Sequence, residues 1–165
     1  MKHPALIGVA AASAVAALAA AAFTGNAQTG ARTIVLRESP AGSLVNFTDN
    51  PPHSTERRGA PMASLGDELA ISTRLLDPAG ARAGRLEATC TTVARGRVQD
   101  GAVFLCTAVA HLADGDLFLS TRFAPANGPN DVRGAIVGGT GAYAGARGGF
   151  TALGAPSTDT FTILP

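Results

Sequence analysis

Two short stretches of this chain decide its fold, Ala88-Thr89-Cys90-Thr91-Thr92 and Phe104-Leu105-Cys106-Thr107-Ala108. The segment between them, Arg95-Gly96-Arg97-Val98-Gln99-Asp100-Gly101, has glycines near both ends and is typical of a turn. An antiparallel hairpin across this turn places Cys90 opposite Cys106. The sequence therefore predicts a cross-strand disulfide, worth about 3 kcal/mol for a loop of about 15 residues. The alternative is that Cys90 is a reactive thiol.

The same hairpin fixes which side chains share a face of the sheet. Centred on Val98, it pairs Thr92 with Phe104 and Ala88 with Ala108. Because side chains alternate along a strand, one face then carries Leu86, Ala88, Cys90, Thr92, Phe104, Ala108 and Ala110. We expect this face to be buried, with the disulfide on it.

The rest of the chain shows no helical periodicity, and turn signals recur at short intervals. Residues 69–75 alternate between apolar and polar or small side chains, as in a strand with two different faces. Residues 50–66 form the one long irregular loop that we expect. The expected strands are 33–37, 43–48, 68–76, 82–94, 101–112, 116–123, 132–137, 146–153 and 158–164. Many short strands without helices favour an all-β barrel or sandwich, and a closed barrel leaves no exposed edge.

The N-terminus predicts export. A short basic start at Met1-Lys2-His3 precedes an apolar run from Ala5 to Phe23, and Gly25-Asn26-Ala27 offers the small residues of a cleavage site. We expect a signal peptide over 1–27 and one secreted domain over 28–165, outside the cell or on the exterior of its envelope. The alternative is an uncleaved membrane anchor, although alanine contributes much less than leucine to membrane transfer. After cleavage we expect no membrane association.

Composition excludes several function classes. Of the 13 basic residues one is Lys2, so 12 Arg oppose 12 Asp and Glu in the expected mature chain. This balance favours neither nucleic acid nor an anionic membrane surface as partner. Without lysine the domain cannot form a Schiff base. Two histidines, His53 and His111, are too few for a metal centre once the cysteines are bridged, and we expect no cofactor.

Three segments resemble a known superfamily. The first is Gly66-Asp67-Glu68-Leu69-Ala70-Ile71-Ser72-Thr73-Arg74-Leu75-Leu76-Asp77, and the second is Ala83-Gly84-Arg85-Leu86-Glu87-Ala88-Thr89-Cys90. The third is Ala135-Ile136-Val137-Gly138-Gly139-Thr140-Gly141-Ala142-Tyr143-Ala144-Gly145-Ala146-Arg147-Gly148. These segments resemble allene oxide cyclases and dirigent proteins, in particular an exported bacterial branch. The resemblance implies an eight-stranded antiparallel barrel, dirigent-like in shape, with an apolar central cavity.

The cavity residues of that family transfer only in part. Allene oxide cyclases use a glutamate on the first strand, an asparagine, a cysteine and a tyrosine. The cysteine position matches Cys90, the tyrosine position Phe123 and the asparagine position Thr73, while the first strand, 33–37, offers no clear inward glutamate. These departures argue against allene oxide cyclisation itself. The remaining cavity candidates are Asp49, a turn former or an acid at the rim, and Tyr143.

The glycines of the third segment are interpreted as turn residues. Gly138, Gly139 and Gly141 follow a strand, but no helix N-terminus is available to receive a phosphate, and glycine permits a positive φ in a tight turn. Arg147 either braces this turn through carbonyl groups or binds a ligand. No serine lies in the sequence context of a hydrolase nucleophile.

Three functions remain open. The first is a secreted barrel that binds a small hydrophobic molecule in its cavity. The second is a dirigent-like auxiliary, a cyclase or isomerase that steers a reactive intermediate by positioning it. The third is a structural or interaction protein whose barrel is filled by side chains. The sequence allows a homo-oligomer but does not identify its contact surface.

Overall fold

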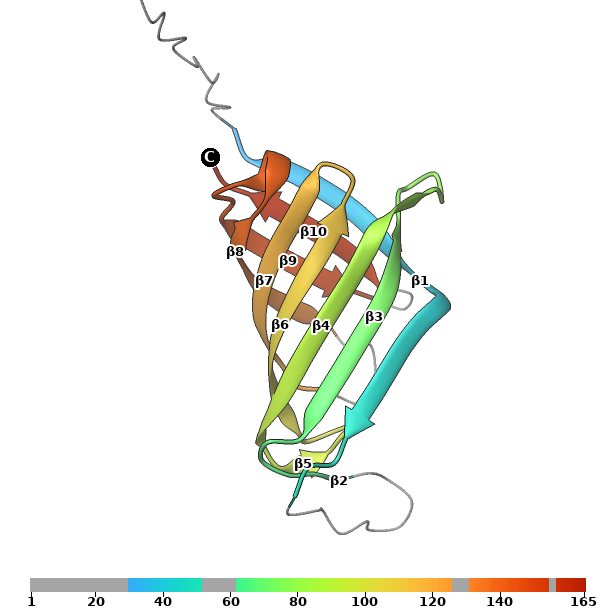
Figure 1. Cartoon of the computed structure of the whole chain (residues 1–165), viewed down its shortest axis with the longest axis vertical. Helices are drawn as coiled ribbons and strands as arrows, with labels where there is room; N and C mark the ends of the chain where they lie inside the picture. The colour runs from blue at the N-terminus through green and yellow to red at the C-terminus, as the bar shows by residue number, and fades with distance from the viewer. Residues whose placement is uncertain (1–29, 52–61, 126–130, 155–156) are drawn as a thin grey trace, which may run out of the picture.

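Eight antiparallel strands close into a barrel in the computed structural model, which describes residues 30–51, 62–125, 131–154 and 157–165 (Figure 1). The expected all-β, eight-stranded fold is thereby confirmed. In the order in which they neighbour one another, the strands are β1 (Arg32–Thr48), β10 (Thr158–Ile163), β9 (Gly148–Leu153), β8 (Val132–Gly139), β7 (Gly115–Phe123), β6 (Val103–Leu112), β4 (Arg82–Ala94) and β3 (Glu68–Leu76).

Strand β1 joins two segments that the sequence suggested as separate strands, 33–37 and 43–48. Its first part pairs with β10 from Arg32 to Arg37, and its last part pairs with β3 from Leu44 to Thr48. The register shifts between Ser39 and Leu44. This irregular stretch contains Pro40, which has no N–H to donate, and Gly42, whose φ is +81°. In Figure 1 β1 bends there and turns down beside β3.

Other strand boundaries agree closely with expectation, and three short elements were not anticipated. Strands 68–76 and 82–94 begin and end where predicted. Met62–Ala63 (β2) lies in the expected loop and pairs with Gly96–Arg97 (β5), so the hairpin centred on Val98 is not a simple tight turn. A single 3₁₀ turn, η1, spans Gly141–Tyr143. Residues 52–61 and the expected signal peptide lie outside the described residues.

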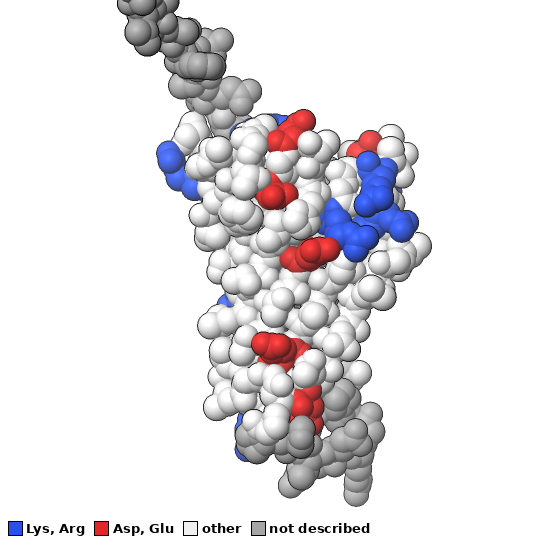
Figure 2. All heavy atoms as spheres, viewed as in Figure 1, with Lys and Arg blue, Asp and Glu red and all other residues white. Residues whose placement is uncertain are grey.

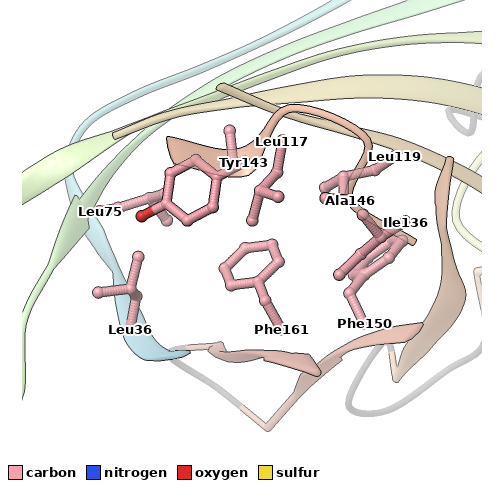
Figure 3. Packing of buried hydrophobic residues seen from close by; sticks show 10 residues of the cluster. Leu36, Leu75, Leu117, Leu119, Ile136, Tyr143, Ala146, Phe150 and Phe161 are labelled. Atoms are coloured by element: carbon pink, nitrogen blue, oxygen red, sulfur yellow. The ribbon is translucent and has the colours of Figure 1, made fainter. Parts of the chain in front are cut away.

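The barrel interior holds two apolar clusters at opposite ends. One, the β10-end cluster, gathers around Phe161, Phe150, Tyr143, Leu117 and Leu75, and Figure 3 shows these side chains converging across the barrel. The second, the disulfide-end cluster, contains Ala63, Leu69, Cys90, Ala102, Phe104 and Cys106. Among the described residues, no helix is both long and apolar enough to cross a membrane.

Candidate functional site

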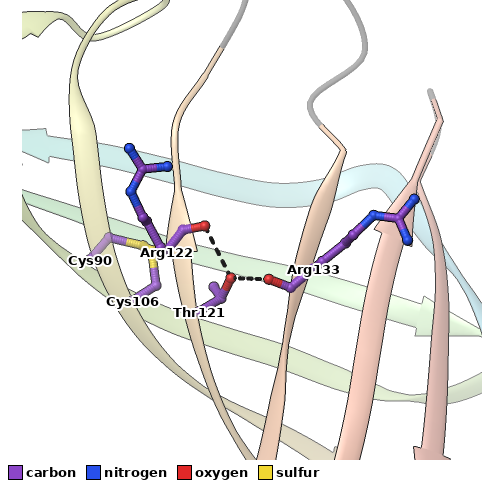
Figure 4. The surroundings of a disulfide bond; sticks show 5 residues. All are labelled: Cys90, Cys106, Thr121, Arg122 and Arg133. Carbon is purple, nitrogen blue, oxygen red and sulfur yellow. Dashed lines mark hydrogen bonds between the residues drawn. A yellow bond between two sulfur atoms is a disulfide. The ribbon is translucent and has the colours of Figure 1, made fainter.

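The predicted disulfide is present. Cys90 and Cys106 are directly opposite one another on β4 and β6, with Cα atoms 3.9 Å apart and the sulfur atoms bonded. Both cysteines are buried and face the barrel interior. On the next strand, Thr121 is paired with Cys106, and its hydroxyl donates to the carbonyl of Arg133 at 2.6 Å (Figure 4). The bridge therefore ties the interior wall together and leaves no described free thiol.

The expected hairpin register is also confirmed. Ala88 pairs with Ala108 and Thr92 with Phe104. The face that carries Cys90 is the interior face, so Glu87, one residue away from Ala88 on the same strand, lies on the exposed outer face.

The β10 end of the interior is filled by side chains. Phe161, Leu75 and Leu117 have no measurable exposure, and the rings of Phe150 and Phe161 lie 6.3 Å apart. Tyr143, a cavity candidate, is 5% exposed within this cluster, and the Arg32 guanidinium lies 5.2 Å from the centre of its ring. This end of the barrel is packed core.

A pair of carboxylic acids interrupts the apolar interior. Asp159 on β10 is 1% exposed and pairs across the sheet with Leu36, while Glu38 on β1 pairs with the buried Leu75. Paired residues face the same side of a sheet, so both acids point inward. The two carboxyl groups lie close enough to affect one another's ionisation. Ser157 Oγ donates to Asp159 Oδ1 at 3.4 Å, and no protein donor reaches Oδ2.

This burial changes the acidity of both groups. Burial and the neighbouring Glu38 charge raise the pKa of Asp159 to about 7, against a weaker opposing effect of the Ser157 hydroxyl. Burial also raises the pKa of Glu38, while its hydrogen bond with Asp159 lowers it. Two adjacent buried acids resist double ionisation, so the pair holds one proton near neutral pH. It can thus both donate and accept a hydrogen bond.

A hydroxyl network adjoins the acid pair on β1 and β3. Thr73 is 2% exposed, and its Oγ1 lies 2.7 Å from Ser43 Oγ. Ser43 Oγ donates in turn to the carbonyl of Ser39, the residue after Glu38. The irregular stretch of β1 therefore supplies polar groups to the middle of the barrel.

Beyond the acid pair, no described strand covers β1 on one side of the barrel wall. In the described chain, β1 has no strand partner on the side away from β3 once it has passed Arg37. Val45 faces the same side as its inward partner Ile71, yet it is 68% exposed. Ile71 and Phe47 are half-buried against the disulfide-end cluster. An apolar inner surface is therefore accessible to solvent next to the acid pair.

The remaining predicted site residues lie at different places. Phe123 is inward at the disulfide end, with its ring 6.1 Å from that of Phe104. Asp49 follows the end of β1 and is half-buried. Of the proposed cavity set, Thr73 lies next to the acid pair, whereas Tyr143 belongs to the filled end and Cys90 to the disulfide.

The glycine-rich segment forms a close-packed turn beside β7. Gly141 has a φ of +57°, and a Cβ there would lie 2.3 Å from the carbonyl oxygen of Asp114. A Cβ on Gly139 would lie 2.4 Å from the Tyr143 carbonyl oxygen, and one on Gly138 would touch the ring of Phe118. Arg147 donates to the carbonyl of Pro165 at the C-terminus.

Sequence reasoning missed both acids of the pair. The first strand was expected to end at Arg37, one residue before Glu38, and so showed no inward glutamate. The signal was present, because Ile34, Leu36 and Glu38 continue one alternating face. Asp159 alternates in the same way with Phe161 on β10.

Comparison with known proteins identifies the fold alone. No family model and no curated protein matches the sequence. Among solved structures, a pyocyanin demethylase superposes with a TM-score of 0.59 and 22% identity, covering 80% of this chain and 99% of its own. This chain has the barrel fold of that enzyme.

Proposed function

We propose that this chain is a secreted barrel protein that binds a small hydrophobic molecule in the barrel interior, at the open edge beside β1. One observation carries the proposal: a buried acid pair, Glu38 and Asp159, lies where the filled half of the interior gives way to an accessible apolar wall. A buried carboxyl group without a full set of partners is costly for folding and is characteristic of a functional site.

The chemistry of the site suits a mainly apolar ligand with one polar group. Val45 and Ile71 offer apolar contact, and Asp159 Oδ2 lacks a protein donor. Because this oxygen is buried, a ligand N–H or O–H must enter from the accessible edge beside β1 to reach it and satisfy it. Apolar surfaces with a few well-placed polar groups are the common composition of small-molecule sites. The solved structure with a similar barrel fold is a pyocyanin demethylase, and an enzyme that acts on a small molecule is consistent with a small-molecule ligand here.

Secretion is supported by the disulfide as well as by the N-terminal sequence. Structural disulfides form and persist in oxidising compartments. The bridge between Cys90 and Cys106 is buried in the barrel wall, as a structural bridge would be.

The test compares two neighbouring substitutions on opposite faces of β1. Val45 and Leu44 are both 68% exposed, but Val45 faces inward with Ile71 and Leu44 faces outward. We expect Val45→Asp to weaken the binding of an apolar fluorescent probe by about tenfold or more, which is about 1.4 kcal/mol. Leu44→Asp is the matched control and should bind the probe as the wild type does.

Native mass spectrometry of the protein isolated from its secretion medium complements this titration. A bound small molecule of defined mass supports the proposal. If the protein carries no ligand and binds no apolar probe, or if the two Asp variants behave alike, a structural role becomes the better interpretation.

A second function, a cyclase or isomerase auxiliary, is favoured by the proton that the acid pair holds. Such a pair can donate a proton to a bound intermediate and take one back. In this case Glu38→Gln should abolish turnover of the ligand identified by mass spectrometry while its binding persists. Loss of binding together with turnover would indicate that the pair only anchors the ligand.

A further inference from the structure

The outer face of five adjacent strands carries an ordered surface pattern unrelated to the interior. Strands β3, β4, β6, β7 and β8 present four rows of outward side chains, each row running across the strands. From the disulfide end these are a first row of Glu68, Thr91, Leu105, Arg122 and Arg133, a second of Ala70, Thr89, Thr107, Ser120 and Ala135, a third of Ser72, Glu87, Val109 and Phe118, joined by Val137 at the register shift of β8, and a fourth of Arg74, Arg85, His111 and Asp116.

The two middle rows differ in side-chain size. The second row contains only Ala, Ser and Thr, all exposed. The third row includes Phe118 and Val137, which are 37% and 62% exposed. A hollow of about 620 Å³ lies between these rows. A row of small residues beside a row of large ones gives the surface a trough and a ridge.

The two outer rows carry charges of opposite sign at their two ends. In the first row the β3 end is acidic, with Glu68, and the β7 end is basic, with Arg122. In the fourth row the order is reversed, because Arg74 lies on β3 and Asp116 on β7. Figure 2 shows this face, with basic and acidic groups above a white band and acidic groups below it. Of the two middle rows, only the third contains a charged residue, Glu87. A face of mixed sign suits neither nucleic acid nor an anionic membrane.

We propose that this face binds a second copy of the same chain, through a two-fold axis that crosses the strands between Thr107 and Val109. This axis lies in the plane of the face, parallel to the rows. It places the first row of one copy on the fourth row of the other, and the second row on the third. Each ridge then enters the trough of the other copy, with Thr107 against the second copy's Val109. Isologous contacts of this kind require a self-complementary surface.

The same axis also pairs the charges. Glu68 faces the second copy's Arg74, and Arg122 faces the second copy's Asp116, each twice in the dimer. If both outer rows had their acidic residue on β3, the same axis would place like charges of the two copies opposite one another. The pattern is therefore complementary to itself in sign as well as in shape, and opposite potentials across an interface favour the correct partner.

The face is large enough for a stable contact. A standard interface uses about 20–30 residues a side, and the 19 residues of the four rows come close to the lower end of this range. Two large hydrophobic residues within the face, Leu105 in the first row at 54% and Val137 on β8 at 62%, are exposed in the single chain. Packing two sheets face to face at about 10 Å would bury them.

The first test places a bulky charge in the trough. We expect the isolated protein to sediment as a dimer at about 100 µM and Thr107→Arg to be monomeric, a weakening of at least tenfold. The matched control is Thr33→Arg, an exposed threonine on the outer face of β1, which should remain dimeric. A cooperative thermal transition in both variants shows that they are folded, although the monomeric variant should unfold at a lower temperature because it has lost the stabilisation by its partner.

The second test reverses the charge at each of two positions, so its outcome does not depend on whether one particular variant folds. Glu68→Arg and Arg74→Glu should each weaken the dimer at low salt, because each homodimer then has like charges in contact. Mixed together, the two variants should form a heterodimer, because both contacts then join opposite charges. One contact joins the two introduced residues, and the other joins the native Glu68 of one variant to the native Arg74 of the other. A monomeric wild type, an assembly of three, a dimer that tolerates Thr107→Arg, or a mixture that forms no heterodimer overturns the proposal.

Discussion

The carboxyl group of Asp159 lies against that of Glu38 inside the barrel, at the point where β1 leaves β10 and continues along β3 alone. The two acids come from opposite ends of the described chain and meet only because β1 and β10 close the barrel. This junction separates the packed end of the interior from the end that opens to solvent.

The acid pair makes stability depend on pH. Burial and the Glu38 charge raise the pKa of Asp159 to about 7 in the folded protein, whereas an unfolded aspartate has a pKa of about 3.9. Between these values only the folded state holds the proton. The contribution of Asp159 to the free energy of unfolding is therefore highest below about pH 4, falls as the pH rises to about 7, and levels off above it.

Asp159→Asn should remove this dependence, because an amide does not titrate. We expect the variant to be more stable than the wild type above pH 7 by roughly 1–3 kcal/mol, and to show a flat profile between pH 4 and 7 in urea unfolding. Asp114→Asn, in the exposed turn before β7, is the control and should keep the wild-type slope. An Asp159→Asn profile parallel to the wild type would contradict the assignment of the proton to this pair.

Reduction of the disulfide should destabilise the barrel without rearranging it. Cys90 and Cys106 are separated by 16 positions, and closing such a loop is worth about 3 kcal/mol. We expect the double variant Cys90→Ser, Cys106→Ser to lose about this much in guanidinium unfolding, and the wild type to lose the same with reductant. A selective loss of ligand binding at unchanged stability would instead indicate a reactive thiol at Cys90.

Phe161 is the residue whose truncation should damage the filled end most. It has no measurable exposure and lies among Leu36, Phe150 and Tyr143. Phe161→Ala should cost about 3–5 kcal/mol. Val35→Ala on the outer face of β1, where Val35 is 42% exposed, should cost less than about 1 kcal/mol. Comparable losses in thermal unfolding for the two variants would mean that this end is not packed core.

Asp67 should hold the chain ends that flank residues 52–61. Its carboxylate accepts hydrogen bonds from the backbone N–H groups of Asn50 at 3.0 Å and Ser64 at 2.7 Å, and from the Ser64 hydroxyl at 3.1 Å. Asp67→Asn turns one accepting oxygen into a donor and leaves a buried N–H unpaired, which should cost about 1–3 kcal/mol.

The matched control for Asp67 is Asp77→Asn in the turn between β3 and β4. There only one carboxylate oxygen is used, by the Ala81 N–H at 2.8 Å, and asparagine serves this turn position equally well. We expect a loss below about 0.5 kcal/mol. Limited proteolysis should also cut the Asp67→Asn chain faster within residues 50–66 than it cuts the control.

Much of the fold could be predicted from local sequence. The alternation in residues 68–76 and 82–94 marks strands whose ends are set by turn residues such as Asp77 and Gly80. The register of β4 on β6 followed from centring the hairpin on Val98, which placed Cys90 opposite Cys106 and so predicted the disulfide. Within such a hairpin, each side chain's face depends on neighbours only two residues away.

The candidate site could be predicted far less well. Thr73 was selected and lies beside the acid pair, but the placement of Glu38 depends on a bulge at Ser39–Leu44 that keeps β1 continuous while it changes partner. Whether Tyr143 lines an open cavity or fills the packed end depends on what packs against it from β1 and β10. The contacts with β1, such as Leu36 with Tyr143 and Glu38 with Asp159, join residues more than a hundred positions apart.

The sequence by itself determined the strands, their two faces and the disulfide, because each of these follows from side-chain alternation, turn chemistry or the pairing of two cysteines. The tertiary structure alone decided which acids meet, which end of the barrel is filled and which rows of the outer face lie side by side. The physical reason is closure: a buried carboxyl pair and a self-complementary surface exist only when distant strands are brought into register, and no local pattern records that register.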